Sequence, residues 1–215
     1  VRKAIEILDK HPVNIERESR GLLKANAILL RDAEDRMPSV KPIAELHSRV
    51  FGAVVEMPVE IGIAKLLGMK FQHVGYPTGN PAKDLPVRLN ATLKLIDEVN
   101  VVYVHLKGPD EPGHDGDFER KVKAIEDIDR YFIQPLIGSI DLGKVAVMVT
   151  ADHATPPQVG SHTADIVPLM VSYRGLSRFD DIPRFTEKYC VERGSIGIID
   201  SGFKVLRKVF NLLEV

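Results

Sequence analysis

Residues suited to binding divalent metal ions occur in three places along this 215-residue chain. Asp110 and His114 lie in an Asp-Glu-Pro-Gly-His segment, and Asp152 is followed directly by His153. His162 comes next, within a Gly-Ser-His-Thr segment. Carboxylate oxygens and imidazole nitrogens are ligands for zinc and manganese, and carboxylates also bind magnesium. Together these side chains suffice for a two-metal site, which predicts metal-dependent phosphoryl transfer.

Apolar segments rich in valine surround these residues. Residues 101–106 and 145–149 run up to the first two groups, and residues 166–171 follow His162. Short apolar runs between helical patterns are typical of buried parallel strands. Because ligands of open α/β sheets bind beyond the carboxyl ends of the strands, we expect the metal-ligand residues to converge there.

Strand-like and helix-like segments alternate through most of the chain. This alternation predicts an α/β fold, a three-layer sandwich with a mostly parallel sheet between helices. The other expected strands are residues 25–30, 52–57 and 71–75. The expected helices are residues 1–10, 40–50, 59–67, 84–97, 118–132 and 202–213, and residues 172–197 are expected to be rich in loops.

The first candidate group also has a simpler interpretation. Pro112 and Gly113 predict a turn that brings Asp110 and His114 together, and we expect them to exclude a helical i, i+4 arrangement. Turns are rich in aspartate and glycine in any case, so a solvent-exposed turn without a metal ion is the alternative.

The second and third groups strengthen the metal hypothesis when they are taken together. Adjacent side chains that leave a strand point in different directions, so Asp152 and His153 favour neighbouring or bridging positions over chelation of one ion by both. His162 alone would be an ordinary exposed histidine, but it lies on the same expected loop as Asp152. The combination favours a metal site over chance.

Three arginines are candidates for binding a phosphate or carboxylate group. Arg31 and Arg36 follow the expected strand at residues 25–30, and Arg88 lies near the start of the expected helix at residues 84–97. A guanidinium group can hold a phosphate through two parallel hydrogen bonds. For each arginine taken singly, a solvated surface charge is the better interpretation.

Composition excludes several classes of function. The chain has 29 basic and 30 acidic residues, a net charge of −1, and no basic stripe, which disfavours nucleic acid and anionic membranes as partners. No apolar run approaches the length of a membrane span. The single cysteine, Cys190, cannot form an internal disulfide, so we expect a cytoplasmic location.

Four segments resemble one known family. VHLKGPDEPGHDGD (104–117), followed by KVKAIEDID (121–129), resembles the alkaline phosphatase superfamily and, within it, the archaeal-type cofactor-independent phosphoglycerate mutases. VMVTADH (147–153) and SHTADIVP (161–168) are similar to that family's later metal motifs, in the same order. ANAILLR (25–31) is similar to the segment where the family's chain re-enters its catalytic domain. The resemblance covers nearly the whole chain.

The resemblance implies a role for each candidate ligand. Asp110, His114 and His162 would hold one divalent ion, and Asp152 with His153 would contribute to the second. The family's ions are manganese, zinc or magnesium.

The resemblance also implies substrate contacts. Arg31 matches an arginine that binds the substrate's phosphate or carboxylate, and Arg88 falls where related sequences often carry a lysine. The implied substrate is phosphoglycerate, whose phosphoryl group passes through an enzyme serine to the other hydroxyl.

One part of the family's site has no counterpart in this chain. The family places the nucleophilic serine and one metal-binding aspartate in an N-terminal segment, and Ser161 belongs to a different motif. We therefore expect a C-terminal half that is incomplete at its N-terminus, with the missing N-terminal half as its partner. Residues 1–24 would end an inserted or linker region, and residues 25–215 would belong to the catalytic domain. Val1, which is not a methionine, fits this expectation but also fits simple processing.

The expected function is metal-dependent interconversion of 2-phosphoglycerate and 3-phosphoglycerate in glycolysis, with the serine supplied by the missing segment. This chain alone is expected to be inactive. Two alternatives stay open: another phosphomutase or phosphatase of the superfamily, such as a phosphopentomutase, and a non-catalytic metal-binding fragment.

Overall fold

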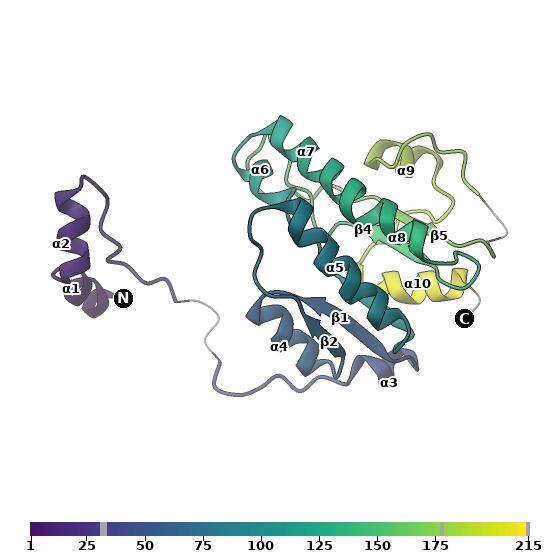
Figure 1. Cartoon of the computed structure of the whole chain (residues 1–215), viewed down its shortest axis with the longest axis horizontal. Coiled ribbons are helices and arrows are strands. Elements are labelled where there is room, and N and C mark those ends of the chain that lie inside the picture. The colour runs from purple at the N-terminus through teal and green to yellow at the C-terminus, as the bar shows by residue number, and fades with distance from the viewer. Residues whose placement is uncertain (31–33, 177–178, 214–215) are drawn as a thin grey trace. The chain divides into compact units, whose positions relative to one another are not determined.

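Two compact units make up the chain in its computed structural model, which describes residues 1–30, 34–176 and 179–213. The units are Val1–Ser39 and Val40–Val215 (Figure 1). The boundary expected after residue 24 therefore falls inside the first unit, and the assignment of residues 25–39 to a catalytic domain stays a prediction. Within the described residues, no helix is long and apolar enough to cross a membrane.

The first unit contains helices α1 (Arg2–Leu8) and α2 (Pro12–Ser19). The strand expected at residues 25–30 is wrong, because these residues form no ladder with another strand in the described part of the chain. Instead, the buried side chain of Asn14 accepts a hydrogen bond from the Ala25 N–H and donates one to the Ala25 carbonyl. A side-chain amide thus satisfies backbone groups that a neighbouring strand would otherwise satisfy.

The second unit contains a small parallel sheet. Strand β1 (Phe51–Val55) lies between β2 (Lys70–His73) and β3 (Val101–Val104), and both pairings are parallel. Every residue of β1 is buried, as its unbroken apolar sequence predicts for a central parallel strand. The α/β class and a parallel sheet are thereby confirmed.

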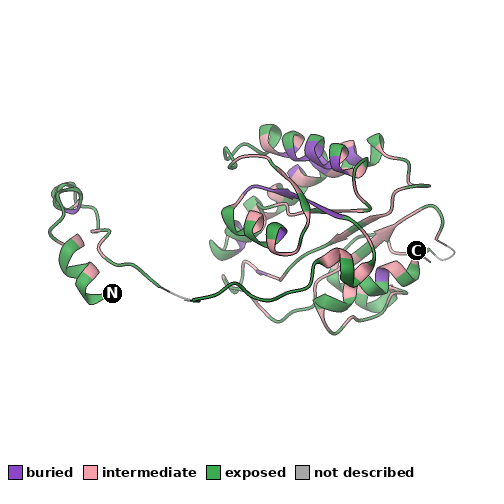
Figure 2. Cartoon of the chain, turned by 90° about the horizontal axis from the view of Figure 1, so that it is seen from below, coloured by how far each residue is buried: buried purple, intermediate pink, exposed green. Residues whose placement is uncertain are grey.

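Helices cover both faces of this sheet. Val54 packs against α5 (Pro81–Ile96), while Ala53 and Val55 pack on the opposite face against α4 (Pro58–Leu66). Successive side chains of a strand point to opposite faces, so one short strand contributes to both layers of the core. Figure 2 shows that the buried positions concentrate on β1 and along α5.

The second sheet departs from the expectation of a mostly parallel arrangement. Strand β4 (Val147–Thr150) pairs with β5 (Leu169–Ser172) in antiparallel orientation. The connection at residues 151–168 contains no helix and folds back on itself through an antiparallel bridge between Ala154 and Thr163. Parallel pairing of two consecutive strands needs a crossover connection, which is usually a helix. Because the 151–168 connection has no helix and folds back on itself, β5 runs antiparallel to β4.

The remaining helices differ from the expected ranges mainly at their ends. The helix expected at 40–50 shortens to one turn, the one expected at 118–132 ends in a π-helical turn, and the loop-rich 172–197 stretch contains a helix. These elements are α3 (Ile43–His47), α7 (Phe118–Ile128), η1 (Asp129–Ile133), α8 (Gln134–Ser139), α9 (Glu187–Arg193), η2 (Gly202–Lys204) and α10 (Val205–Leu212).

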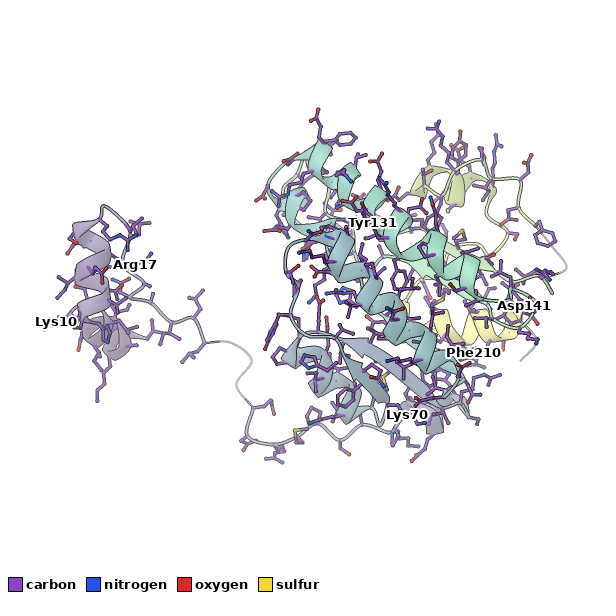
Figure 3. The ribbon with its side chains drawn as sticks, viewed as in Figure 1. Lys10, Arg17, Lys70, Tyr131, Asp141 and Phe210 are labelled. Atoms are coloured by element: carbon purple, nitrogen blue, oxygen red, sulfur yellow. The ribbon has the colours of Figure 1, made fainter. Side chains whose placement is uncertain are left out.

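Two aromatic side chains that are labelled in Figure 3, Tyr131 and Phe210, attach peripheral elements to the rest of the second unit. Tyr131, in the π-helical turn, packs against the buried cluster that α5 shares with η1 and α8. The centroid of the Phe210 ring on α10 lies 5.6 Å from the centroid of the His47 ring. The guanidinium carbon of Arg49 lies 4.6 Å from the same Phe210 centroid. The two contacts of Phe210 join α10 to the segment that precedes β1.

The expectation that Pro112 and Gly113 exclude a helix is wrong, because Asp110–His114 forms a short helix, α6. The first N–H groups of a helix have no partner within it, so a proline in the third position loses no hydrogen bond. Gly113 is buried, and a Cβ atom there would collide with the carbonyl oxygen of Thr155. Glycine therefore allows α6 to approach the 151–168 loop closely.

Leu95→Ala tests the core between α5 and the parallel sheet. Leu95 is fully buried and packs with Val54 and Ala91, so we expect a loss of about 2–5 kcal/mol in the free energy of unfolding. Denaturant unfolding followed by circular dichroism measures this loss. Leu46→Ala on α3, where the side chain is exposed, is the control and should change stability by less than about 0.5 kcal/mol.

Gly113→Ala tests the close approach of α6 to the loop. The added methyl group should push the two segments apart and destabilise the chain by about 1–3 kcal/mol, measured by the same unfolding transition. Gly62→Ala in α4, where nothing lies within 4 Å of the new Cβ, should instead leave stability unchanged or raise it by up to about 1 kcal/mol. Equal effects of the two substitutions would contradict this account of Gly113.

Candidate metal centre

Three of the candidate ligands meet at one point. Asp110 and His114 occupy the first and last positions of α6, so their side chains share one face, with 3.5 Å between Asp110 Oδ2 and His114 Nε2. His162 reaches the same point from the 151–168 loop. Its Nε2 lies 3.1 Å from His114 Nε2 and 3.5 Å from Asp110 Oδ1.

The geometry of this trio fits a divalent ion. One ligand atom from each residue lies within 4.8 Å of the other two. Metal–ligand bonds of ~2.0–2.1 Å in a tetrahedron place neighbouring ligand atoms ~3.3 Å apart, close to the separations seen here. One carboxylate and two imidazoles form a donor set suited to zinc or manganese. All three residues are exposed, so an ion and a substrate could reach them from solvent.

Asp152 and His153 lie beside this trio. The His153 ring stacks on the His162 ring with 3.7 Å between centroids. The expectation that adjacent side chains diverge does not describe this pair, because His153 Nε2 lies 3.3 Å from Asp152 Oδ2. One atom from each can therefore reach the same ion, next to the position that Asp110, His114 and His162 surround.

The hydrogen bond to His114 prepares it for binding a metal ion. Its Nδ1 lies 3.0 Å from the carbonyl oxygen of Gly160. A carbonyl oxygen can only accept, so Nδ1 carries the proton, and the Nε2 lone pair of the neutral ring faces His162 and Asp110. A backbone carbonyl thus orients the imidazole and selects its tautomer.

Asp110 is held in its ionised form. The hydroxyl of Thr155 donates a hydrogen bond of 2.6 Å to Asp110 Oδ1, and this bond is the main cause that lowers the carboxyl's pKa below its ordinary value. Partial burial opposes the shift, whereas electrostatic interaction with the imidazoles of His114, His153 and His162 reinforces it. An ionised carboxylate is the form that binds a cation.

Two residues that the sequence analysis did not identify hold the site's segments together. Thr155 is buried, with 4% of its surface exposed. Lys121 on α7 donates from Nζ to the carbonyl oxygens of Pro109 (2.9 Å) and Thr155 (3.0 Å). The only sequence signal for Thr155 is a hydroxyl side chain two positions after His153, and no pattern in the sequence indicates the role of Lys121.

The three candidate arginines differ in their setting. Arg31 lies outside the described residues, and Arg36 belongs to the first unit, where its Nε contacts Asp35. Arg88 is buried and forms an ion pair with Glu56, and burial lowers its pKa. The guanidinium group of Arg88 is thus occupied by a carboxylate of the protein.

A network of charges joins the ends of β1 and β3 near α6. Lys107, which follows β3, places its Nζ 3.3 Å from Glu56 Oε1 and 3.1 Å from Glu60 Oε1. The Nδ1 of His105 lies 3.1 Å from the same Glu60 oxygen. Burial raises the pKa of Glu60, but hydrogen bonds from Met57 N, Lys107 and His105 outweigh it and lower the pKa overall. This network fixes the point from which the chain enters α6.

Comparison with known proteins identifies relatives over almost the full length of the chain. The chain is 43% identical over 219 residues to a 2,3-bisphosphoglycerate-independent phosphoglycerate mutase of Aeropyrum pernix, a match that covers 98% of this chain and 50% of the relative. The 2,3-bisphosphoglycerate-independent phosphoglycerate mutase 1 of Archaeoglobus fulgidus is 36% identical over 217 residues, a match that covers 100% of this chain and 51% of the relative. The chain therefore spans about half the length of the curated relatives it matches.

Solved structures give the same picture. A Pyrococcus horikoshii protein matches with a TM-score of 0.78 and 29% identity, over 100% of this chain and 55% of that one. A cofactor-independent phosphoglycerate mutase from Thermoplasma acidophilum matches with a TM-score of 0.59 over 98% of this chain and 49% of that one; at 24% identity, this second match supports the fold alone.

The sequence profile of one family matches residues 53–203, a range that contains all five candidate ligands and the segments that position them. Homology to the archaeal phosphoglycerate mutases agrees with this match and confirms the resemblance noted in the sequence. The chain belongs to the Metalloenzyme superfamily.

Proposed function

We propose that this chain forms the metal-binding part of a phosphoglycerate mutase. In this proposal, Asp110, His114 and His162 hold one divalent ion, and Asp152 and His153 contribute to a second. The observation that carries the proposal is the convergence of the first three residues from two separate segments onto one point. Homology to archaeal phosphoglycerate mutases supports phosphoglycerate as the substrate.

Divalent ions at such a site would stabilise the negative charge that develops on the transferring phosphoryl group. The protein's contribution is to keep the ligands fixed and correctly protonated. Thr155 keeps Asp110 ionised, and the Gly160 carbonyl accepts from Nδ1 of His114, which leaves Nε2 as the nitrogen that can bind an ion. Asp152 is the most exposed of the ligands, with 67% of its side chain accessible, which leaves its side of the site open to a substrate.

We also propose that a segment outside this chain supplies the nucleophilic serine, which would become a phosphoserine when it accepts the phosphoryl group. The same segment would complete a three-layer sandwich. A covalent phosphoryl intermediate requires an activated nucleophile beside the ions. The proposal rests on the family resemblance and on the coverage of about half of each relative. Manganese, zinc and magnesium remain the candidate ions, and a cytoplasmic location stays a prediction.

His162→Ala tests the ion site directly. Removal of one of three ligands should weaken the binding of Mn²⁺ or Zn²⁺ to this chain by more than about 10-fold, measured by isothermal titration calorimetry. His73→Ala on β2 is the matched control, because its ring contacts Tyr76 rather than the ligand group. If the His162 variant binds as tightly as the unmodified chain, the proposed ion site is wrong.

Asp152→Asn tests the assignment to phosphoglycerate mutase and requires the longer protein that contains this chain. With saturating manganese, the substitution should abolish interconversion of the two phosphoglycerates, since it removes a ligand of the second ion. Asp97→Asn, at an exposed position just after α5, should retain activity. Release of free phosphate without isomerisation would instead favour a phosphatase, and metal binding without either reaction would favour a non-catalytic role.

A further inference from the structure

The hydroxyl of Thr155 lies between the two candidate ligand groups. Its Oγ1 is 2.6 Å from Asp110 Oδ1, in the first group, and 3.1 Å from Nδ1 of His153, in the second. Asp110 and His153 reach the site on different segments, α6 and the 151–168 loop. Thr155 is therefore the side chain through which the two groups are hydrogen-bonded to each other.

Thr155 has little freedom to leave this position. It is 4% exposed, its carbonyl oxygen accepts a hydrogen bond from Lys121, and its methyl group faces the backbone of Gly113. Lys121 also binds the carbonyl oxygen of Pro109, directly before Asp110. The same contacts that bury Thr155 thus fix its distance from Asp110.

The number of protons available decides how each partner is bonded. A threonine hydroxyl has one proton, and it donates that proton to the Asp110 carboxylate, which can only accept. Toward His153 the hydroxyl oxygen is then the acceptor, which suits a donor at Nδ1. The Nε2 of His153 lies 3.3 Å from Asp152 Oδ2, an acceptor that competes for the ring's proton when no ion is bound. An ion bound at Nε2 would leave the proton of the neutral ring on Nδ1, where the Thr155 oxygen can accept it.

We propose that Thr155 is a positioning residue that orients the Asp110 carboxylate and, as the acceptor facing Nδ1 of His153, turns that ring so that Nε2 can bind an ion together with Asp152. This inference rests on the proposed function above. A single hydroxyl thereby prepares ligands of both ions.

Thr155→Val and Thr155→Ser separate the hydroxyl from the shape of the side chain. Valine keeps both branches and removes the hydroxyl, whereas serine keeps the hydroxyl. Thr92→Val is the matched control, because Thr92 is equally buried at 4% and its hydroxyl donates to the Arg88 carbonyl within α5, not to a candidate ligand. All four proteins should show the same far-ultraviolet circular dichroism.

The test titrates these four proteins with Mn²⁺ or Zn²⁺ by isothermal titration calorimetry. Thr155→Val should bind about 10–100-fold more weakly than the unmodified chain, as is typical when a group that orients a ligand is lost. Thr155→Ser and Thr92→Val should bind as the unmodified chain does. Equal affinity of the valine and serine variants at position 155 overturns the inference alone. Absence of ion binding by the unmodified chain would overturn the proposed metal centre, and with it the ion-binding role of Thr155.

Discussion

The contact between α6 and the 151–168 loop is the constraint on which the candidate site depends. Lys121 holds the backbone on both sides of this contact, at Pro109 and Thr155, and Gly113 removes the side chain that would keep them apart. Asp110 and His114 lie on one side, and the histidines of the loop lie on the other. Without this contact the ligands would belong to two independent segments. The separations of 3.1 Å and 3.5 Å that join His162 to His114 and Asp110 would then not be maintained.

The parallel sheet determines where the contact forms. β1 is buried on both faces, and the pairing with β3 directs the chain from Val104 toward α6. At the same end, Lys107 bridges Glu56 and Glu60, so the segment leaving β3 is tied to the end of β1 and the start of α4. A buried ion pair alone gives little net stability, because both charges lose hydration. Its clearest effect here is to fix the geometry of the polypeptide near the site.

Much of this arrangement could be predicted from the sequence, and the failures have physical causes. The central strand and the convergence of Asp110, His114 and His162 followed from apolar runs and from the placement of active sites at strand ends. The α6 helix contradicts the expectation from Pro112 because proline excludes a helix only beyond the first turn, where it would remove a backbone hydrogen bond. The strand at 25–30 was wrong because local composition does not reveal whether a partner strand exists. Long-range contacts, such as those of Lys121, leave no periodic signal in one sequence.

The central claim is that Asp110, His114 and His162 surround an ion, with a second ion beside Asp152 and His153. Anomalous X-ray diffraction from crystals of this chain grown with Zn²⁺ or Mn²⁺ tests it most directly. We expect a peak within ~2.0–2.2 Å of Oδ of Asp110 and Nε2 of both histidines, and a second, weaker peak beside Asp152 and His153. Peaks only at other surface residues, with the three side chains free of metal, would contradict the account.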